Sequence, residues 1–357
     1  MDIISLLMAA AERDTSDVHL IASRPPMLRI NGALEPFETG PVLNGEDVRA
    51  AFCQITNPEQ QKEFERNKEL DFSRTLPDGR RVRCNAAYQQ GTVSMVIRIL
   101  PLVVYDIDAL GLPPVCKDLI LRPRGLIMVS GPTGSGKSTT LAAMLKHLNA
   151  SQKRRVVTIE DPVEYIHPSE KCAVTQRELG QDTTSFAEAL RHVLRQDPDV
   201  ILVGEMRDTE TAAAVMNVAE TGHLVLTTGH ASSAAQAAER IVDLFPPHER
   251  NLVQTRLATL LLGIICQVLV PKAEGKGRAV AVEVMMAIPP IRNLIREGKL
   301  YQLPNIIRTN SQSGMVMLDQ SLVNLFREGV ITREHLFSFC NDRDEVEKLV
   351  SFASCVS

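Results

Sequence analysis

A glycine-rich segment near the middle of the chain carries the most specific chemistry. Residues 131–138, GPTGSGKS, fit the pattern G-x-x-x-x-G-K-[ST]. An apolar run at 125–130 precedes the segment and a helical pattern at 137–148 follows it, as a phosphate-binding loop requires. The ordinary alternative, a glycine-rich turn without a ligand, does not need that context. The segment predicts a nucleotide site made of Gly131, Thr133, Gly134, Ser135, Gly136, Lys137, Ser138 and Thr139.

The residues of this loop also indicate which cofactors it takes. Glycines let backbone N–H groups approach phosphates closely, and the start of a helix adds a fixed positive end. Lys137 can reach the β- and γ-phosphates, and the Ser138 hydroxyl can bind Mg²⁺. We therefore expect ATP and Mg²⁺ as cofactors.

Two apolar strands end in acids. Residues 199–205, DVILVGE, resemble a Walker B element, a strand expected beside the loop strand that brings a carboxylate to Mg²⁺ and the attacking water. We expect Glu205 to activate water and to contact the metal through water. Glu160, after the strand 155–159, is the second candidate, because ligands bind at the carboxyl edge of open α/β sheets. A surface acid or a simple turn residue is the alternative for each.

Two histidines bracket a third strand, in the segment 221–230 with the sequence TGHLVLTTGH. His230 falls at the carboxyl end of this strand, where it could donate a hydrogen bond to the γ-phosphate. His223 falls at the opposite end, and its role is less easily explained. Single histidines are more often ordinary core or surface residues than functional ones. His223 and His230 are both candidate catalytic residues.

Arginines gather on two expected strands of the first hundred residues. Arg80, Arg81 and Arg83 lie on one strand and Arg98 on the next. Arg81 and Arg83 face the same side because they are two residues apart. A solvated sheet face is the ordinary interpretation of such a pattern.

The elements that position these residues form two parts. Residues 1–100 predict an α+β domain, with a helix near 3–11, a turn at Asn31-Gly32, a helix at 57–68 and three strands between 70 and 100. A proline-rich stretch at 101–114 predicts a linker. Residues 115–357 predict an α/β domain with a parallel sheet, since apolar strands alternate with helices. From about residue 289 the chain is expected to be helical.

Composition narrows the classes of partner. The 357 residues carry Lys+Arg 39 against Asp+Glu 43, a net charge of -4, no Trp and 4 Tyr. This disfavours a nucleic-acid binder, which needs cationic and stacking groups. The seven cysteines are odd in number and form no C-x-x-C, which favours reduced thiols in a cytosolic protein. The N-terminus resembles no signal peptide, and the apolar run 257–270 is too short to cross a bilayer, so any membrane role needs a partner.

Together these motifs resemble the PilT family of secretion ATPases, the retraction motors of type IV pili. The resemblance covers nearly the whole chain: GPTGSGKST, TIEDPVEYIH, DPDVILVGEMRD and AETGHLVLTTGH occur in the family's order, followed by IRNLIREGK at 291–299. It implies a PAS-like N-terminal domain, a RecA-like ATPase domain and a homohexamer with ATP between domains and subunits. It also implies that Arg83 and Arg98 approach the γ-phosphate as the domains close.

The family resemblance carries expectations about partners and location as well. The partner would be the pilus platform protein of the inner membrane, and the chain would be cytoplasmic, peripheral at the inner face of that membrane. Two departures from the family pattern stand out: Gly229-His230-Ala231 replaces the usual Leu-His-Thr, and Pro290 replaces Ala. An accessory motor of the PilU type with weak ATPase activity, or a nucleic-acid translocase on the same core, are the alternatives.

Overall fold

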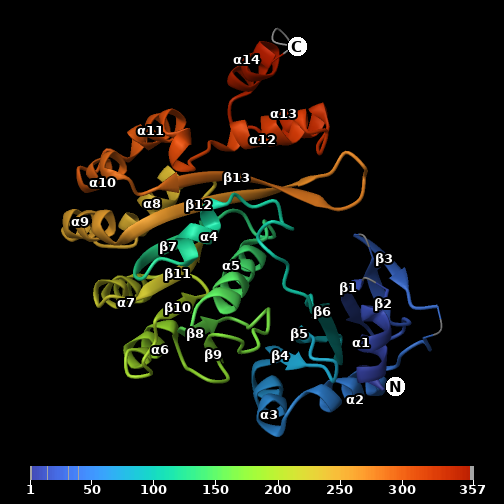
Figure 1. Cartoon of the computed structure of the whole chain (residues 1–357). Helices are drawn as coiled ribbons and strands as arrows, with labels where there is room; N and C mark the ends of the chain where they lie inside the picture. The colour runs from blue at the N-terminus through green and yellow to red at the C-terminus, as the bar shows by residue number, and fades with distance from the viewer. Residues whose placement is uncertain (1, 14, 31, 39, 354–357) are drawn as a thin grey trace. The chain divides into compact units, whose positions relative to one another are not determined.

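The computed structural model describes residues 2–13, 15–30, 32–38 and 40–353, and it divides the chain into two compact units (Figure 1). Unit 1 comprises the chain up to Val103 together with Pro162–Ile166, and unit 2 comprises Val104–Asp161 and His167 onward. Asn31, half of an expected turn, and Cys355 lie outside the described residues. Each unit has its own sheet and its own apolar core, so the expected α/β class is confirmed.

Unit 1 is built on a six-stranded sheet with the order β3-β2-β1-β6-β5-β4. Every neighbouring pair is antiparallel, as the irregular alternation of elements predicted. The strands are β1 (Thr15–Leu20), β2 (Met27–Ile30), β3 (Ala33–Pro36), β4 (Glu69–Thr75), β5 (Arg81–Gln89) and β6 (Thr92–Ile99). Arg80 lies just before β5 rather than on it.

Three helices complete unit 1: α1 (Ile3–Ala11), α2 (Gly45–Ile55) and α3 (Pro58–Asn67). Asn44 and Asn57 each cap a helix, and Asp47 and Gln60 return the hydrogen bond, so α2 and α3 both start with a capping box. The helix α2 and the strand β3 were not expected from the sequence. The strand β3 is an exposed four-residue edge strand without a clear period, whereas α2 buries Val48, Ala51, Phe52 and Ile55 at a helical spacing that was overlooked.

Unit 2 is built on a seven-stranded sheet with the order β13-β12-β7-β11-β10-β8-β9. All pairs are parallel except β12–β13, which form an antiparallel hairpin at one edge. The strands are β7 (Gly125–Ser130), β8 (Arg155–Glu160), β9 (Ala173–Glu178), β10 (Val200–Val203), β11 (Leu224–Gly229), β12 (Leu261–Pro271) and β13 (Arg278–Met286). The parallel sheet is confirmed, whereas β9 and the hairpin were not expected.

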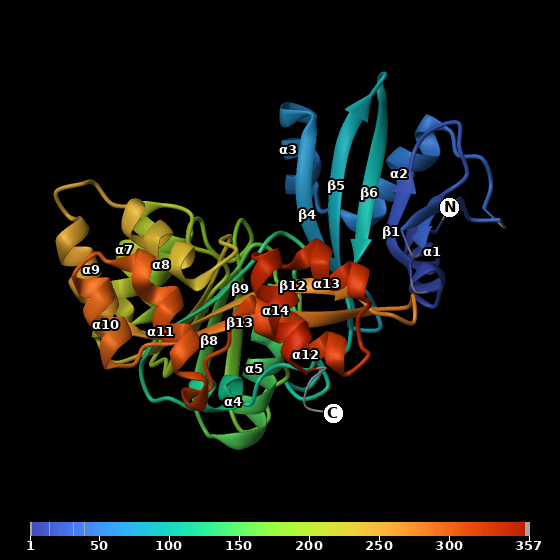
Figure 2. The same cartoon turned by 90° about the horizontal axis from the view of Figure 1, so that it is seen from above.

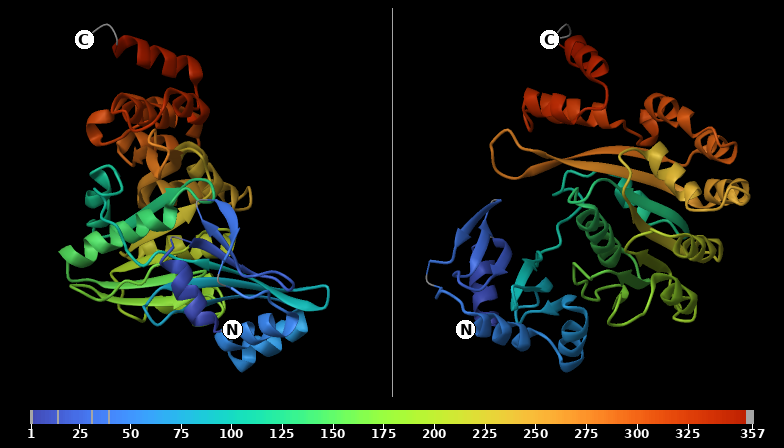
Figure 3. Two further views of the ribbon diagram at one scale, coloured as in Figure 1. Left: turned by 90° about the vertical axis from the view of Figure 1, so that its right-hand side faces the viewer. Right: turned by 180° about the vertical axis from the view of Figure 1, so that it is seen from behind.

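The helices of unit 2 cover both faces of its sheet (Figures 1 and 3). Helix α5 packs on one face, against Ile127 and Val129, and α6, α7 and α8 pack on the other, against Met128 and Val203. The helices are α4 (Val115–Ile120), α5 (Lys137–Ser151), α6 (Phe186–Val193), α7 (Thr209–Glu220), α8 (Ala234–Asp243) and α9 (Arg250–Leu260).

The chain after β13 is helical, and α10 begins at Pro289. Helices α10 (Pro289–Arg296), α11 (Leu303–Thr309), α12 (Leu318–Arg327), α13 (Arg333–Phe339) and α14 (Arg343–Ala353) follow one another, with α12 packed on β13 (Figure 2). Pro290 occupies the first turn of α10, where proline is tolerated because its missing N–H has no partner there. None of the described helices is long and apolar enough to cross a membrane.

One expectation about strand order was wrong. The strand that ends before Glu205, β10, does not lie beside β7, because β11 is inserted between them. Parallel strands nevertheless end at a common edge, so Glu205 still reaches the edge that carries the loop after β7.

The boundaries between the two units differ in detail from the sequence segments. Within 101–114, Ile107 and Leu112 are buried in the core of unit 2, and Lys146 Nζ lies 3.0 Å from Asp106 Oδ1 and donates to the carbonyl of Val104. Pro162–Ile166 belongs to unit 1, where Arg81 donates from Nε to the Val163 carbonyl at 3.3 Å.

Candidate active site

The loop between β7 and α5 has the backbone that phosphate binding requires. Gly131 has φ +146° and Gly136 has φ +88°, values that residues other than glycine rarely adopt. A Cβ on Gly131 would lie 2.3 Å from the Gln267 carbonyl, so the loop packs tightly against β12. Pro132, Thr133 and Gly134 are exposed, which leaves the outer side of the loop open to a ligand.

Lys137 starts α5 and folds back over this loop. Its Nζ donates to the carbonyls of Gly131 at 2.8 Å and Pro132 at 3.0 Å, so the ammonium lies where a phosphate would sit. Ser138 and Thr139 follow in the first turn, half-buried. The Ser135 hydroxyl is buried and finds no hydrogen-bond partner among the residues that the structure describes, so it is a polar group that a bound phosphate would satisfy. The loop therefore fits a nucleotide.

Gln267, in the middle of β12, is a loop-supporting residue that the sequence did not indicate. Its side chain is buried, its Nε2 donates to the Ser135 carbonyl at 2.6 Å, and its Oε1 accepts from Thr140 Oγ1 at 2.8 Å. One amide thus ties the loop to the first turn of α5. A glutamine interrupting the otherwise apolar run 257–270 was the available signal.

Strand register brings the other candidate residues to the same edge of the sheet. Val203 pairs with Ile159 on one side and with Thr227 on the other, and Gly229 pairs with Ser130 at the end of β7. Glu160, Glu205 and His230 therefore all lie at the carboxyl edge, together with the loop at Gly131. This confirms the placement that the sequence predicted for these acids and for His230.

Glu205 is a mostly buried carboxylate at this edge. Its side chain is 16% exposed, and its Oε2 lies 2.7 Å from Arg207 Nε and 3.6 Å from His230 Nε2. The contacts with Arg207 and His230 orient the carboxylate. Such a group can orient a water molecule and accept a proton from it.

Glu160 accepts hydrogen bonds from two neighbouring strands. Its Oε1 accepts from Thr158 Oγ1 at 2.6 Å and from Gln176 Nε2 at 3.2 Å, the latter on β9. Glu160 is thereby anchored to β8 and β9 at this edge.

His223 lies at the opposite edge of the sheet. It directly precedes β11, its carbonyl accepts from Gly125 N, and its Nδ1 lies 3.0 Å from Thr221 Oγ1 and 3.1 Å from the Val218 carbonyl. Within unit 2 it does not join the other candidates. Its contacts are those of a residue that closes the turn after α7.

Arg83 and Arg98 lie in unit 1 and are direct neighbours across β5 and β6. Both are exposed, on the same face of the sheet. Arg98 Nε lies 2.9 Å from Oδ1 of the buried Asp17, whereas no ion pair of Arg83 is found among the described residues. Two like charges directly opposite one another are unfavourable in a sheet, and Asp17 offsets this by balancing Arg98.

A second set of contacts, which the sequence did not indicate, supports the loop that carries His230. Ser130 Oγ, at the end of β7, donates to the Ala231 carbonyl and accepts from Ala231 N, both at 2.8 Å. Three residues further on, Ala234 N donates at 2.6 Å to Glu283, a buried acid on β13. Glu283 thus caps the start of α8 and anchors the loop that carries His230.

The described residues contain no preformed group of three or more His, Cys, Asp and Glu side chains that could hold a metal. A divalent ion at this edge would depend on the nucleotide phosphates for ligands, with Ser138 as the nearest hydroxyl in the loop.

Taken together, the parallel sheet, the loop at 131–138 and the acids at the carboxyl edge define a RecA-like P-loop ATPase preceded by a PAS-like domain. The family described as "Type II/IV secretion system protein" matches residues 74–322. The chain belongs to this family, and within it to the PilT group of ATPases.

Individual relatives support this placement across the whole chain. The chain is 46% identical over 335 residues to "Type IV pilus retractation ATPase PilT" of Pseudomonas aeruginosa, covering 94% of this chain and 97% of the relative. It is 38% identical over 354 residues to "Type IV pilus ATPase PilU" of the same organism, covering 99% and 92%. The crystal structure of the pilus retraction motor PilT with bound ADP superposes with a TM-score of 0.91 at 40% identity, covering 98% and 99%.

Proposed function

We propose that this chain is the ATP-hydrolysing motor that drives retraction of type IV pili and thereby twitching motility. The observation that carries the proposal is the convergence of the phosphate-binding loop, Glu205, Glu160 and His230 at one edge of the sheet. This convergence occurs in a chain that is similar in sequence to a pilus retraction ATPase over nearly its full length.

Glu205 is the general base of the proposed hydrolysis. It accepts the proton of a water molecule that attacks the γ-phosphorus, the bond to the bridging oxygen breaks, and ADP and phosphate are released. Lys137 leaves the loop carbonyls and balances charge on the β- and γ-phosphates. Mg²⁺, held by Ser138 and through water by Glu205, would neutralise charge that develops on the phosphates. His230 donates to the γ-phosphate and is oriented by Glu205.

Arg83 and Arg98 supply positive charge from unit 1. Their exposed, side-by-side guanidinium groups suit the spread charge of a transferred phosphoryl group. We propose that they act as arginine fingers when the site closes in a homohexamer. Arg98 also forms an ion pair with the buried carboxylate of Asp17. A catalytic role for His223 would have to arise outside its own unit, because within unit 2 it lies at the other edge.

The proposed partners follow from the similarity to pilus motors. The motor would act on the platform protein of the inner membrane, from the cytoplasmic side, with no segment of its own in the bilayer and no nucleic acid as a substrate. The net charge of -4 supports the last point.

A second candidate, an accessory ring subunit of the PilU type, is favoured by the 38% identity over 99% of the chain. A deletion strain separates the two. Loss of twitching with surplus surface pili is expected for the retraction motor. Normal twitching in the deletion strain, together with negligible ATPase activity of the purified chain, would instead support the accessory subunit.

A further inference from the structure

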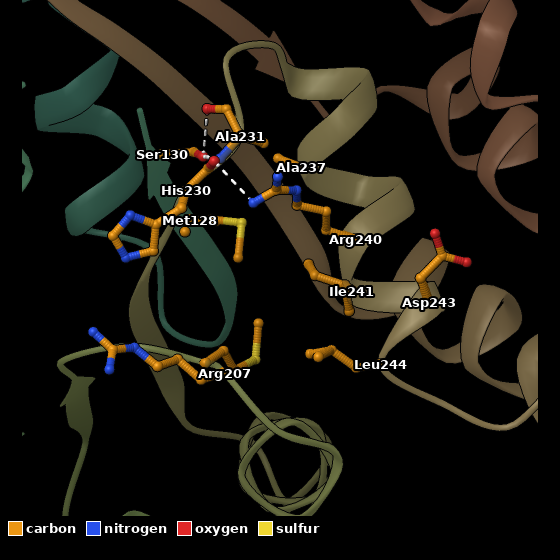
Figure 4. A pocket seen from close by; sticks show the side chains of 12 residues that line it. Met128, Ser130, Arg207, His230, Ala231, Ala237, Arg240, Ile241, Asp243 and Leu244 are labelled. Carbon is orange, nitrogen blue, oxygen red and sulfur yellow. Dashed lines mark hydrogen bonds between the residues drawn. The ribbon is translucent and has the colours of Figure 1, made fainter. Parts of the chain in front are cut away.

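A cavity of about 510 Å³ opens in unit 2 beside His230 (Figure 4). Its walls come from the ends of β7 and β11, the loop after β10, and α8. Met128 and Ile241, which line it, belong to the core on the face opposite α5. Ser130, which also lines the cavity, directly precedes the phosphate-binding loop, so the cavity adjoins the catalytic edge.

Two small residues keep this cavity open. A Cβ on Gly229 would lie 3.2 Å from Sδ and Cε of Met128 and from Oγ of Ser130, so a side chain at position 229 would crowd two residues that line the cavity. Ala231, on the other side of His230, also lines the space. These are the two positions at which the chain departs from the Leu-His-Thr of the family it resembles. A leucine at 229 would displace Met128 or Ser130 and so change the cavity wall.

The chemistry of the lining indicates what the cavity accepts. The floor is apolar and polarisable, formed by Met128, Met206, Ile241 and Leu244. At the rim, Arg207 is balanced by Glu205, and Asp243 lies 2.9 Å from Arg250, so these charges are neutralised. Arg240 has no acid within ion-pair distance among the described residues, and one N–H of its guanidinium donates to the His230 carbonyl at 3.0 Å.

From this combination we infer that the cavity is a binding site for a small amphipathic anion, an apolar body that carries one carboxylate or sulfonate. The apolar body would fill the floor beside Gly229, and the anionic group would pair with the exposed guanidinium of Arg240. Guanidinium groups bind carboxylates through two parallel hydrogen bonds, so donors other than the one used on His230 suffice. A phosphate without an apolar body would leave the floor empty and is not expected to bind.

Such a ligand would act on hydrolysis through the two loops that carry His230 and Glu205. Arg240 holds the carbonyl of His230, and the cavity wall at Met206 and Arg207 directly follows Glu205. A ligand that contacts both loops restrains the two residues at the catalytic edge. This consequence rests on the proposed ATPase function, whereas binding itself does not.

The test uses the full-length chain and 1-anilinonaphthalene-8-sulfonate as the fluorescent probe. We expect one saturable site per chain, displaced by octanoate but not by octylamine, which has the same apolar chain and the opposite charge. Gly229→Leu should abolish saturable binding, and Arg240→Gln should weaken it about tenfold, the value of a charge-assisted hydrogen bond. Arg195→Gln, an exposed arginine that does not line the cavity, is the control and should bind like the unmodified chain.

Several results would overturn the inference. Equal probe binding by Gly229→Leu, equal displacement by octanoate and octylamine, or no saturable binding at all would each do so. Arg240→Gln, at the exposed rim, keeps the test decisive if Gly229→Leu does not fold. Binding that increases when assembled rings are dissociated, followed by size-exclusion chromatography, would show that a neighbouring subunit covers the cavity. In the ATPase assay, saturating octanoate should change turnover at least twofold in the unmodified chain and leave Gly229→Leu unaffected.

Discussion

Glu205 and Glu160 are both acids at the carboxyl edge, but their surroundings differ. Glu205 contacts an arginine and a histidine, whereas Glu160 accepts hydrogen bonds from a hydroxyl and an amide. A base must release its hydrogen bonds to orient and deprotonate water. The neighbours of Glu205 can move with their loops, while Glu160 is held by residues of β8 and β9.

We therefore predict that Glu205→Gln binds ATP normally and loses hydrolysis by at least about 100-fold, since the amide can orient water but cannot accept its proton. Binding is measured with a fluorescent ATP analogue and hydrolysis by phosphate release. Lys137→Ala is the companion variant and should lose binding as well. Turnover of Glu205→Gln near the unmodified rate would transfer the role of base to Glu160.

The two candidate arginine fingers, Arg83 and Arg98, differ in their ion pairs. Arg98 pairs with Asp17, whereas no ion pair of Arg83 is found among the described residues. We predict that Arg83→Ala lowers ATPase activity at least tenfold with no change in melting temperature, because an exposed charge contributes about 0–1 kcal/mol to stability. Arg98→Ala should lower both, because it leaves the buried carboxylate of Asp17 without its ion pair. Calorimetry and phosphate release on both variants check this. Equal melting temperatures would contradict the structural role of Arg98.

At the level of elements, β12 is an unexpected contributor to the nucleotide site. Its Gln267 amide satisfies the Ser135 carbonyl and the Thr140 hydroxyl at once, and all three groups are buried. Removing the amide leaves two buried polar groups unpaired, at about 1–3 kcal/mol each. The loop then loses the support that holds it ready for phosphate.

We predict that Gln267→Leu weakens binding of a fluorescent ATP analogue about tenfold or more, while the chain stays folded by circular dichroism. Thr140→Val removes only one of the two hydrogen bonds and serves as the matched variant, with a smaller loss. If Gln267→Leu bound the analogue as tightly as the unmodified chain, the loop would not depend on β12.

Glu283 links β13 to the start of α8 and gives a pH-dependent prediction. Burial raises the pKa of its carboxyl above the usual 4.5, and the nearby charge of Asp319 adds to the effect. The folded chain therefore binds a proton at higher pH than the unfolded chain does. The free energy of unfolding consequently falls as the pH rises from about 4.5 through the raised pKa.

Glu283→Gln keeps an oxygen that accepts from Ala234 N but cannot ionise. We predict that its free energy of unfolding depends less on pH across this window than that of the unmodified chain. Urea titrations at several pH values between about 4.5 and 8 measure the slope. Parallel slopes for the two proteins would show that Glu283 does not contribute to it.

At the scale of the whole molecule, the candidate catalytic groups are divided between two compact units. Lys137, Glu205 and His230 belong to unit 2, and Arg83 and Arg98 belong to unit 1. A motor built in this way can convert closure around ATP into movement of one unit. If the ring is a homohexamer, as proposed, the arginines can serve either their own subunit or a neighbour.

We predict that mixing Lys137→Ala with Arg83→Ala restores part of the ATPase activity that each lacks alone. In a mixed ring an intact loop in one subunit can receive the arginine of its neighbour, and phosphate release measures the recovery. Native mass spectrometry verifies that mixed rings form. Mixed rings without recovered activity would place the arginine and the loop of each site in the same subunit.

The sequence by itself determined the features that depend on neighbouring residues. The loop at 131–138 was recognised because its glycines, Lys137 and Ser138 are contiguous and lie between a strand and a helix. The placement of Glu160, Glu205 and His230 at one edge followed from a general property of parallel strands. The order of these motifs along the chain was sufficient to indicate the family.

The tertiary structure alone decided the features made by distant residues. Gln267 and Ser135 are 132 positions apart, and Glu283 and Ala234 are 49 apart, so no local pattern reveals either contact. The insertion of β11 between β7 and β10 depends on sheet order, which the period of apolar residues does not encode. The cavity beside Gly229 likewise needs four segments to meet. Side-chain periodicity reports which face of an element is buried, but only packing specifies the partner that buries it.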